Sequence, residues 1–214
     1  MNDFRLCLAA LAALAASFPL TAAAQPPDAS GAQEPAAFQL SVWDSVQIVD
    51  RLRPIHGLRL SLPYGRNREL QGADVGIVGR IDGNLEGAQF SVAGLVDGNL
   101  TGLQYNWLLS RVGGHLRGAQ LGAVNTVGSF EGAQLGFVNY ARDGALGAAL
   151  AFVNVSEGQT TGAEIGLVNY ARSVQGLQLG FVNVAEHLHG VQVGLVNVAR
   201  NGFLPVFIIV NAAL

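Results

Sequence analysis

The chain has 214 residues, of which 50% are hydrophobic and only 13% are charged, and its formal net charge at pH 7 is −3. The apolar content is enough for one domain, and the small negative charge gives no electrostatic reason to expect nucleic acid as a partner. The single cysteine, Cys7, lies in an N-terminal segment that we expect to be removed. The rest of the chain therefore has no disulfide and no cysteine metal site.

Residues 1–24 have the pattern of a cleavable secretory signal. Arg5 precedes an apolar run from Leu6 to Leu20, and Ala22, Ala23 and Ala24 provide a small-residue cleavage site. The run of about fifteen residues is short for a membrane-spanning helix, which needs roughly 20. We therefore expect an exported protein.

Two short regions follow the signal. Residues 25–36, "QPPDASGAQEPA", combine Pro, Gly, Ser and acids without an apolar period, which is typical of a flexible linker. Residues 37–71 contain "FQLSVW", "VQIV" and "HGLRLSLPYG", which alternate as half-buried strands do. We expect these strands to cap the N-terminal end of the domain.

Residues 72–200 form an array of nine repeats with a period of 14 to 16 residues. The clearest copies are "GAQLGFVNYA", "GAEIGLVNYA", "GLQLGFVNVA" and "GVQVGLVNVA". Two places after a glycine, the units carry what we call the Gln row: Asp74, Gln89, Gln104, Gln120, Gln134, Ala149, Glu164, Gln178 and Gln192. Residues 201–214, "NGFLPVFIIVNAAL", contain an apolar stretch that we expect to cap the C-terminal end.

A second row, the Asn row, follows five residues after the later positions of the Gln row. It consists of Asn125, Asn139, Asn154, Asn169, Asn183 and Asn197. In the earlier units the corresponding places hold Gly79, Gly94 and Leu109, so the start of the array is degenerate. We expect the Asn row to be structural, because equivalent amides in stacked coils can hydrogen bond to one another.

One unit is predicted to be a strand of about eight residues followed by a polar return. Two glycines in each unit and the lack of a 3.6-residue period exclude a helix. In an extended chain, Leu177, Leu179 and Phe181 lie on one side, and Gln178, Gly180 and Val182 lie on the other. We expect the apolar side to be buried against its copies and the Gln row to be exposed.

Two arrangements of such units are compatible with the period. In a β-solenoid each unit is one coil and equivalent residues stack, whereas in an up-and-down β-meander or barrel neighbouring units run antiparallel. The regular Asn row favours stacking, and short returns with only 7% aromatic residues disfavour an outer-membrane barrel. The predicted fold is therefore all-β, a β-solenoid of about nine repeats, with the meander or barrel as the alternative.

The repeat phrase, the entry "HGLRLSLPYGRN" and the exit "NGFLPVFIIVN" resemble a family of bacterial exported surface-repeat proteins with leptospiral-type repeats, which is common in Gram-negative bacteria. The resemblance covers residues 38–211 and departs from the family pattern at Gly79, Gly94 and Leu109. It implies an extracytoplasmic location, in the periplasm, in the outer membrane or at the cell surface. It implies no ligand and no catalytic residue.

The sequence contains no catalytic motif that we recognise. It has no G-x-S-x-G pentapeptide and no lysine for a phosphate-binding loop. His187 and His189 lack a third ligand at a metal-binding spacing. Asp74 and Glu164 are the strongest acids for a sugar-cleaving pair, but six stacked coils would separate them by about 29 Å. We expect no enzyme activity, no cofactor and no metal.

The leading functional hypothesis is a noncatalytic exported repeat protein that serves as a structural or interaction surface in the bacterial cell envelope. The predicted binding surface is the exposed row Gln89, Gln104, Gln120, Gln134, Glu164, Gln178 and Gln192. An envelope protein or a glycan is the expected kind of partner, and membrane association stays open. The alternatives are an outer-membrane β-barrel and, with less support, an envelope enzyme acting on polysaccharide.

Overall fold

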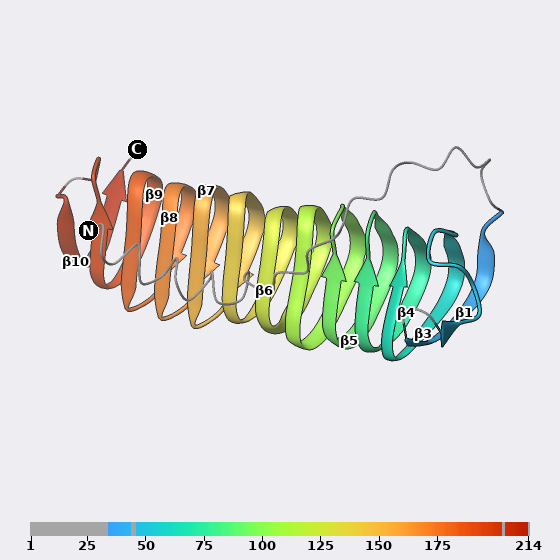
Figure 1. The fold of residues 1–214 in the computed structure, drawn as a ribbon. Coiled ribbons are helices and arrows are strands. Elements are labelled where there is room, and N and C mark those ends of the chain that lie inside the picture. Colours follow the sequence, from blue (N-terminus) through green and yellow to red (C-terminus); the bar gives the residue numbers. More distant parts are fainter. Residues whose placement is uncertain (1–33, 44–45, 203, 214) are drawn as a thin grey trace.

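The computed structural model describes residues 34–43, 46–202 and 204–213, and these form an elongated β-solenoid of about ten turns (Figure 1). The predicted signal, residues 1–24, and most of the predicted linker lie outside the described residues. No membrane-spanning helix occurs in the part of the chain that the structure describes.

Ten strands make one continuous sheet that winds around the axis. They are β1 (Ala36–Trp43), β2 (Val46–Gln47), β3 (Ile55–Asn67), β4 (Leu70–Ile81), β5 (Leu85–Val96), β6 (Leu100–Leu150), β7 (Val153–Ile165), β8 (Val168–Leu179), β9 (Val182–Ala199) and β10 (Val206–Ala213). The order in the sheet is β10-β9-β8-β7-β6-β5-β4-β3-β1-β2. The long β6 covers several successive turns of the coil, as its path in Figure 1 shows.

Parallel register decides between the two predicted arrangements. Each strand from β3 to β8 pairs in parallel with the next, and Gly162 aligns with Gly176 and then with Gly190. The solenoid prediction is therefore confirmed, and the antiparallel alternative is wrong. Strand β3 is already a coil in register with β4, so stacking starts before the regular array.

The two ends differ from the body. At the N-terminal end, β1 pairs in parallel with β3, and β2 turns back antiparallel to β1. At the C-terminal end, β10 pairs antiparallel with β9 and ends the sheet.

A row of glycines with positive φ allows the coils to stack closely. Gly176, with φ of +138°, represents this row, since a Cβ there would overlap the carbonyl oxygen of Gly162 in the coil below. An L side chain would be strained in this backbone region and would also push the coils apart. This explains the glycine that begins every unit.

The interior contains two apolar rows and two polar rows. One apolar row lies two residues before the stacking glycines and includes Leu70, Leu85, Leu100, Leu116, Val174 and Leu188. The other lies two residues after the Asn row and includes Val96, Val112, Val127, Ala141, Ala171, Ala185 and Ala199. The polar rows are the Gln row and the Asn row, which are also buried.

The predicted orientation of the repeat is therefore wrong. Gln178 and Asn183 point into the solenoid, whereas Leu179 and Phe181 lie on its outside with exposures of 41% and 58%. The predicted polar returns are also largely strand, because β9 continues through Glu186 to His189. Hydrogen bonding by stacked amides replaces apolar packing in half of the interior, which the alternating pattern alone does not reveal.

Candidate functional site

The predicted binding row lies inside the protein. Gln89, Gln104, Gln120, Gln134, Glu164, Gln178 and Gln192 are all at most 1% exposed. The prediction that this row forms an exposed binding surface is therefore wrong, because each amide is used within the stack and no atom of it can reach a ligand.

The Gln row forms hydrogen-bonded ladders that point toward the N-terminus. Nε2 of each glutamine donates to the side chain one coil earlier, as from Gln104 to Gln89 at 2.7 Å and from Gln192 to Gln178 at 2.8 Å. The same nitrogen also donates to a backbone carbonyl, which for Gln192 is that of Val198. At the end of this ladder, Oε1 of Gln192 has no partner among the described residues.

The Asn row forms a ladder of the opposite polarity. Nδ2 of each asparagine donates to Oδ1 of the asparagine one coil later, at 2.8–3.0 Å, through Asn125, Asn139, Asn154, Asn169, Asn183 and Asn197. In most coils Nδ2 also donates to a backbone carbonyl of the next coil, as from Asn169 to Leu179. The structural role predicted for this row is supported by these bonds.

The degenerate early coils use other polar side chains. The structure aligns Ser110, not Leu109, with Gly94, because one extra residue in this unit shifts the register. Oγ of Ser110 donates to the carbonyl of Leu121, which is the bond that asparagine makes in later coils. The 16-residue interval is the sequence signal that could have located this shift.

The two acids of the Gln row begin ladders. Asp74 is fully buried, accepts from Gln89 at 2.8 Å, and forms an ion pair with buried Arg59 at 2.6 Å. Glu164 accepts from Gln178 at 2.7 Å and from the hydroxyl of Thr160 at 2.6 Å. Each carboxyl group accepts the hydrogen bond from the glutamine of the next coil and so starts a ladder.

Neither acid can act on a polysaccharide. Their exposures are 0% and 1%, and the register places six coils between them. The described residues contain no group of three or more His, Cys, Asp or Glu side chains that could hold a metal ion.

The solenoid's most distinctive outer feature is an apolar face, which we define as the rows of Leu179 and Phe181. The Leu179 row includes Val75, Phe90, Tyr105, Leu135 and Leu150, and the Phe181 row includes Ile77, Val92, Phe137, Phe152, Leu167 and Leu195. All these side chains are more than a third exposed. In the Phe181 row, Phe137 and Phe152 stack with ring centroids 5.4 Å apart.

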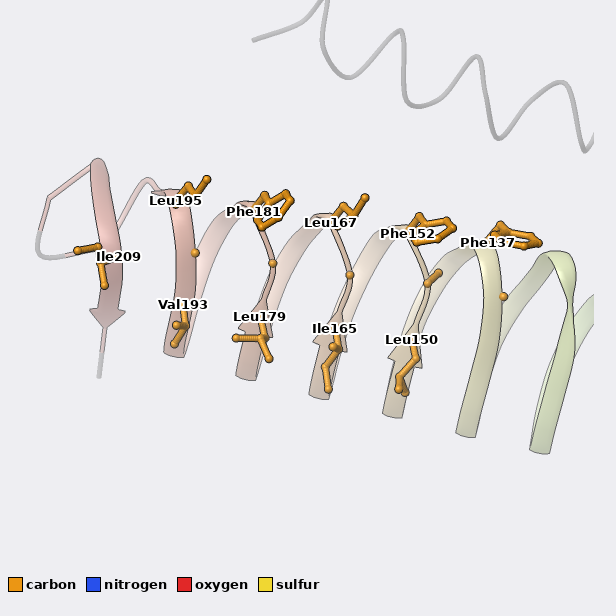
Figure 2. Close-up of a pocket in the computed structure, with 15 residues that line it drawn as sticks. Phe137, Leu150, Phe152, Ile165, Leu167, Leu179, Phe181, Val193, Leu195 and Ile209 are labelled. Atoms are coloured by element: carbon orange, nitrogen blue, oxygen red, sulfur yellow. The ribbon is translucent and has the colours of Figure 1, made fainter.

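A furrow runs between the two rows at the C-terminal half of the face (Figure 2). Its floor includes Gly136, Gly166, Gly180 and Gly194, and it encloses about 750 Å³. A Cβ on Gly180 would meet Nδ2 of Asn169 at 2.7 Å, so the glycine lets the backbone approach the Asn ladder. The buried Asn ladder therefore requires glycine at this position between the two outward rows.

The furrow has no charged side chain in its lining. Phe137, Phe152, Leu167, Phe181 and Leu195 form one wall, while Leu150, Ile165, Leu179 and Val193 form the other (Figure 2). Ile209 of β10 completes the lining at the C-terminal end. Such a site offers dispersion and desolvation to an apolar partner and provides no acid, base or nucleophile.

Comparisons with family models, with curated proteins and with solved structures gave no match. The resemblance described above stays a prediction.

Proposed function

We propose that this chain is a noncatalytic exported repeat protein that presents its apolar face as an interaction surface in the bacterial cell envelope. The observation that carries the proposal is the inversion of the repeat: the amides satisfy one another inside, and leucine and phenylalanine are displayed outside. Monomeric soluble proteins rarely expose contiguous apolar patches larger than a few hundred Å², and larger ones mark interaction sites.

The rest of the molecule supports a scaffold role. The buried amides hydrogen bond to one another in the ladders and so have a structural role. The repeated coil places equivalent outward side chains at a spacing of about 4.8 Å. The N-terminal pattern of residues 1–24 supports export, and we propose a periplasmic, outer-membrane or surface location on that basis.

Cell fractionation tests this proposal. The chain, expressed with a C-terminal tag in a Gram-negative host, should appear in the envelope fraction with residues 1–24 removed. The double variant Phe152→Asp/Phe181→Asp should be exported equally and should be recovered more in the soluble periplasmic fraction or the medium. A chain that stays in the cytoplasm with its N-terminus intact would overturn the proposal.

A further inference from the structure

We propose that the apolar face binds a second copy of this chain, so that two solenoids pack face to face as a homodimer. This inference rests on the proposed function, because it takes the apolar face as the interaction surface and names its occupant. Three properties of the face support it: its area, its shape and the charges at its borders.

The area of the face matches what a stable dimer needs. Its outward rows extend from Val75 to Leu195 and are continued by the exposed Ile208 and Ile209 of β10, where Ile209 pairs with Gly194. With about ten coils spaced 4.8 Å apart, the face is about 48 Å long. Together with the adjoining outward apolar row of Leu177, the strip is five residues wide, or about 17 Å, and covers about 800 Å² per copy. This equals the area that each partner buries in a standard protein interface, about 800 Å².

The shape of the face is self-complementary. Each copy has a ridge, the Phe181 row, beside a furrow floored by Gly166, Gly180 and Gly194. The two walls of the furrow are two residues apart along the strand, about 6.6 Å, which admits one row of side chains. Because both copies repeat at the same spacing of about 4.8 Å, the ridge of one can enter the furrow of the other along its length.

The border charges favour a protein copy over an anionic lipid surface. The face itself has no charged side chain in the Leu179 and Phe181 rows. Glu86, Arg117 and Glu131 lie in a row that precedes the face, whereas Arg142, Glu157, Arg172 and Glu186 alternate in sign five residues beyond the Phe181 row, away from the border of the face. Binding to anionic lipid requires clustered basic residues, which these rows do not provide. Mixed charges suit the polar rim of a protein interface.

Sedimentation equilibrium of the purified protein in detergent-free buffer tests the inference. The wild-type chain should have twice the mass of one chain at micromolar concentrations and above. Phe152→Asp/Phe181→Asp should raise the dissociation constant at least about 100-fold, since it places charge at the centre of the buried ridge. The matched control is Gln159→Asp/Gln175→Asp, which adds the same two negative charges at exposed positions outside the face and should leave the dimer intact.

Circular dichroism and thermal unfolding of each variant separate dissociation from misfolding. Phe152 and Phe181 are 54% and 58% exposed, so the double variant should keep the wild-type β spectrum. Should it fail to fold, small-angle scattering of the wild type gives a second test, because a side-by-side dimer doubles the mass per unit length whereas an end-to-end dimer does not.

The outcomes distinguish this inference from the proposed function. A monomeric wild type, or a dimer that Phe152→Asp/Phe181→Asp leaves unchanged, overturns the inference. A monomer that sediments with phosphatidylcholine/phosphatidylglycerol vesicles through Phe152 and Phe181 also overturns it, but the face keeps its role as an interaction surface. A monomer whose envelope retention does not depend on the face would end both proposals.

Discussion

Nε2 of Gln178 donates a 2.7 Å hydrogen bond to Oε2 of Glu164, whereas the next rung of the ladder pairs two glutamines, Gln192 and Gln178. The coil before Glu164 has Ala149 in this row. The Glu164 side chain therefore has no ladder partner on that side. Burial raises the pKa of Glu164 to about 7, and the hydrogen bonds from Gln178 and Thr160 oppose the rise. The rung formed by Glu164 and Gln178 also lies between the two clusters of buried apolar side chains in the interior. We therefore expect changes at this rung to affect the stability of the stack.

The raised pKa of Glu164 predicts a dependence of stability on pH. Because the folded-state pKa, about 7, is above the ordinary value of 4.5, the stabilisation is complete below pH 4.5 and is lost as the pH rises through 7. The shift corresponds to about 3 kcal/mol. Glu164→Gln should therefore unfold at a similar urea concentration to wild type at pH 4.5 and be more stable by up to about 3 kcal/mol at pH 8.5. Equal pH dependence in both proteins would contradict this assignment.

Asn154→Ala should strongly destabilise the protein. Asn154 donates to Asn169 at 2.9 Å and to the carbonyl of Ile165 at 3.0 Å, and it accepts from Asn139 at 3.0 Å. The substitution leaves buried groups on neighbouring coils without partners, which we expect to cost about 3 kcal/mol in the free energy of unfolding. Urea denaturation measures this loss. The control Gln159→Ala removes an exposed amide in the same coil and should change stability by less than about 1 kcal/mol.

Gly176→Ala should be more damaging than a methyl group suggests. The positive φ of Gly176 and the carbonyl of Gly162 leave no room for a Cβ, so the coils must separate locally. We expect a loss of more than about 3 kcal/mol, or no folded protein, in thermal unfolding followed by circular dichroism. Gln175→Ala, at the exposed position next to it, should fold normally. A folded Gly176→Ala variant with wild-type stability would show that the coils are not stacked this closely.

The buried ion pair at the N-terminal end predicts a clear contrast with a surface pair. Arg59 and Asp74 are both 0% exposed, and Arg59 also donates to the carbonyl of Arg80 at 2.9 Å. Asp74→Ala leaves an unpaired buried charge and should cost about 3–5 kcal/mol. Arg117→Ala, which removes the exposed pair with Glu131, should cost at most about 1 kcal/mol. Similar losses for the two variants would contradict the burial of Arg59.

Much of the fold could be predicted from the sequence, but the inside and outside of the coil could not. The fixed spacing of Asn169, Asn183 and Asn197 was sufficient to favour stacked coils. Which side of the strand faces inward depends on whether the amide of Gln178 can hydrogen bond to its copies in neighbouring coils. The two-residue alternation of side chains along a strand is the same whichever side is buried, so it does not identify the inner side. Ordinary burial preferences favour Leu179 and Phe181 inside, and the continuous amide ladders override them.

The candidate site was missed for the same reason. The sequence pattern predicts that the row of Phe152 and Phe181 lies in the core. For that reason neither residue was predicted to bind a partner. One signal was present: the glycine at position 180 and its copies lie between two bulky residues in the later units. A glycine there indicates a close approach of the backbone to buried side chains, which here are Asn169 and its neighbours.

Hydrogen exchange of side-chain amides, measured by NMR in the assigned protein, tests the central claim most directly. If the amide rows are inside, the NH₂ groups of Gln104, Gln178, Asn169 and Asn183 should exchange far more slowly than those of the exposed Gln159 and Gln175 in the same molecule. Exchange of all six at the rate of exposed amides would contradict the account, because it would place the Gln and Asn rows on the surface and the leucine and phenylalanine rows in the core.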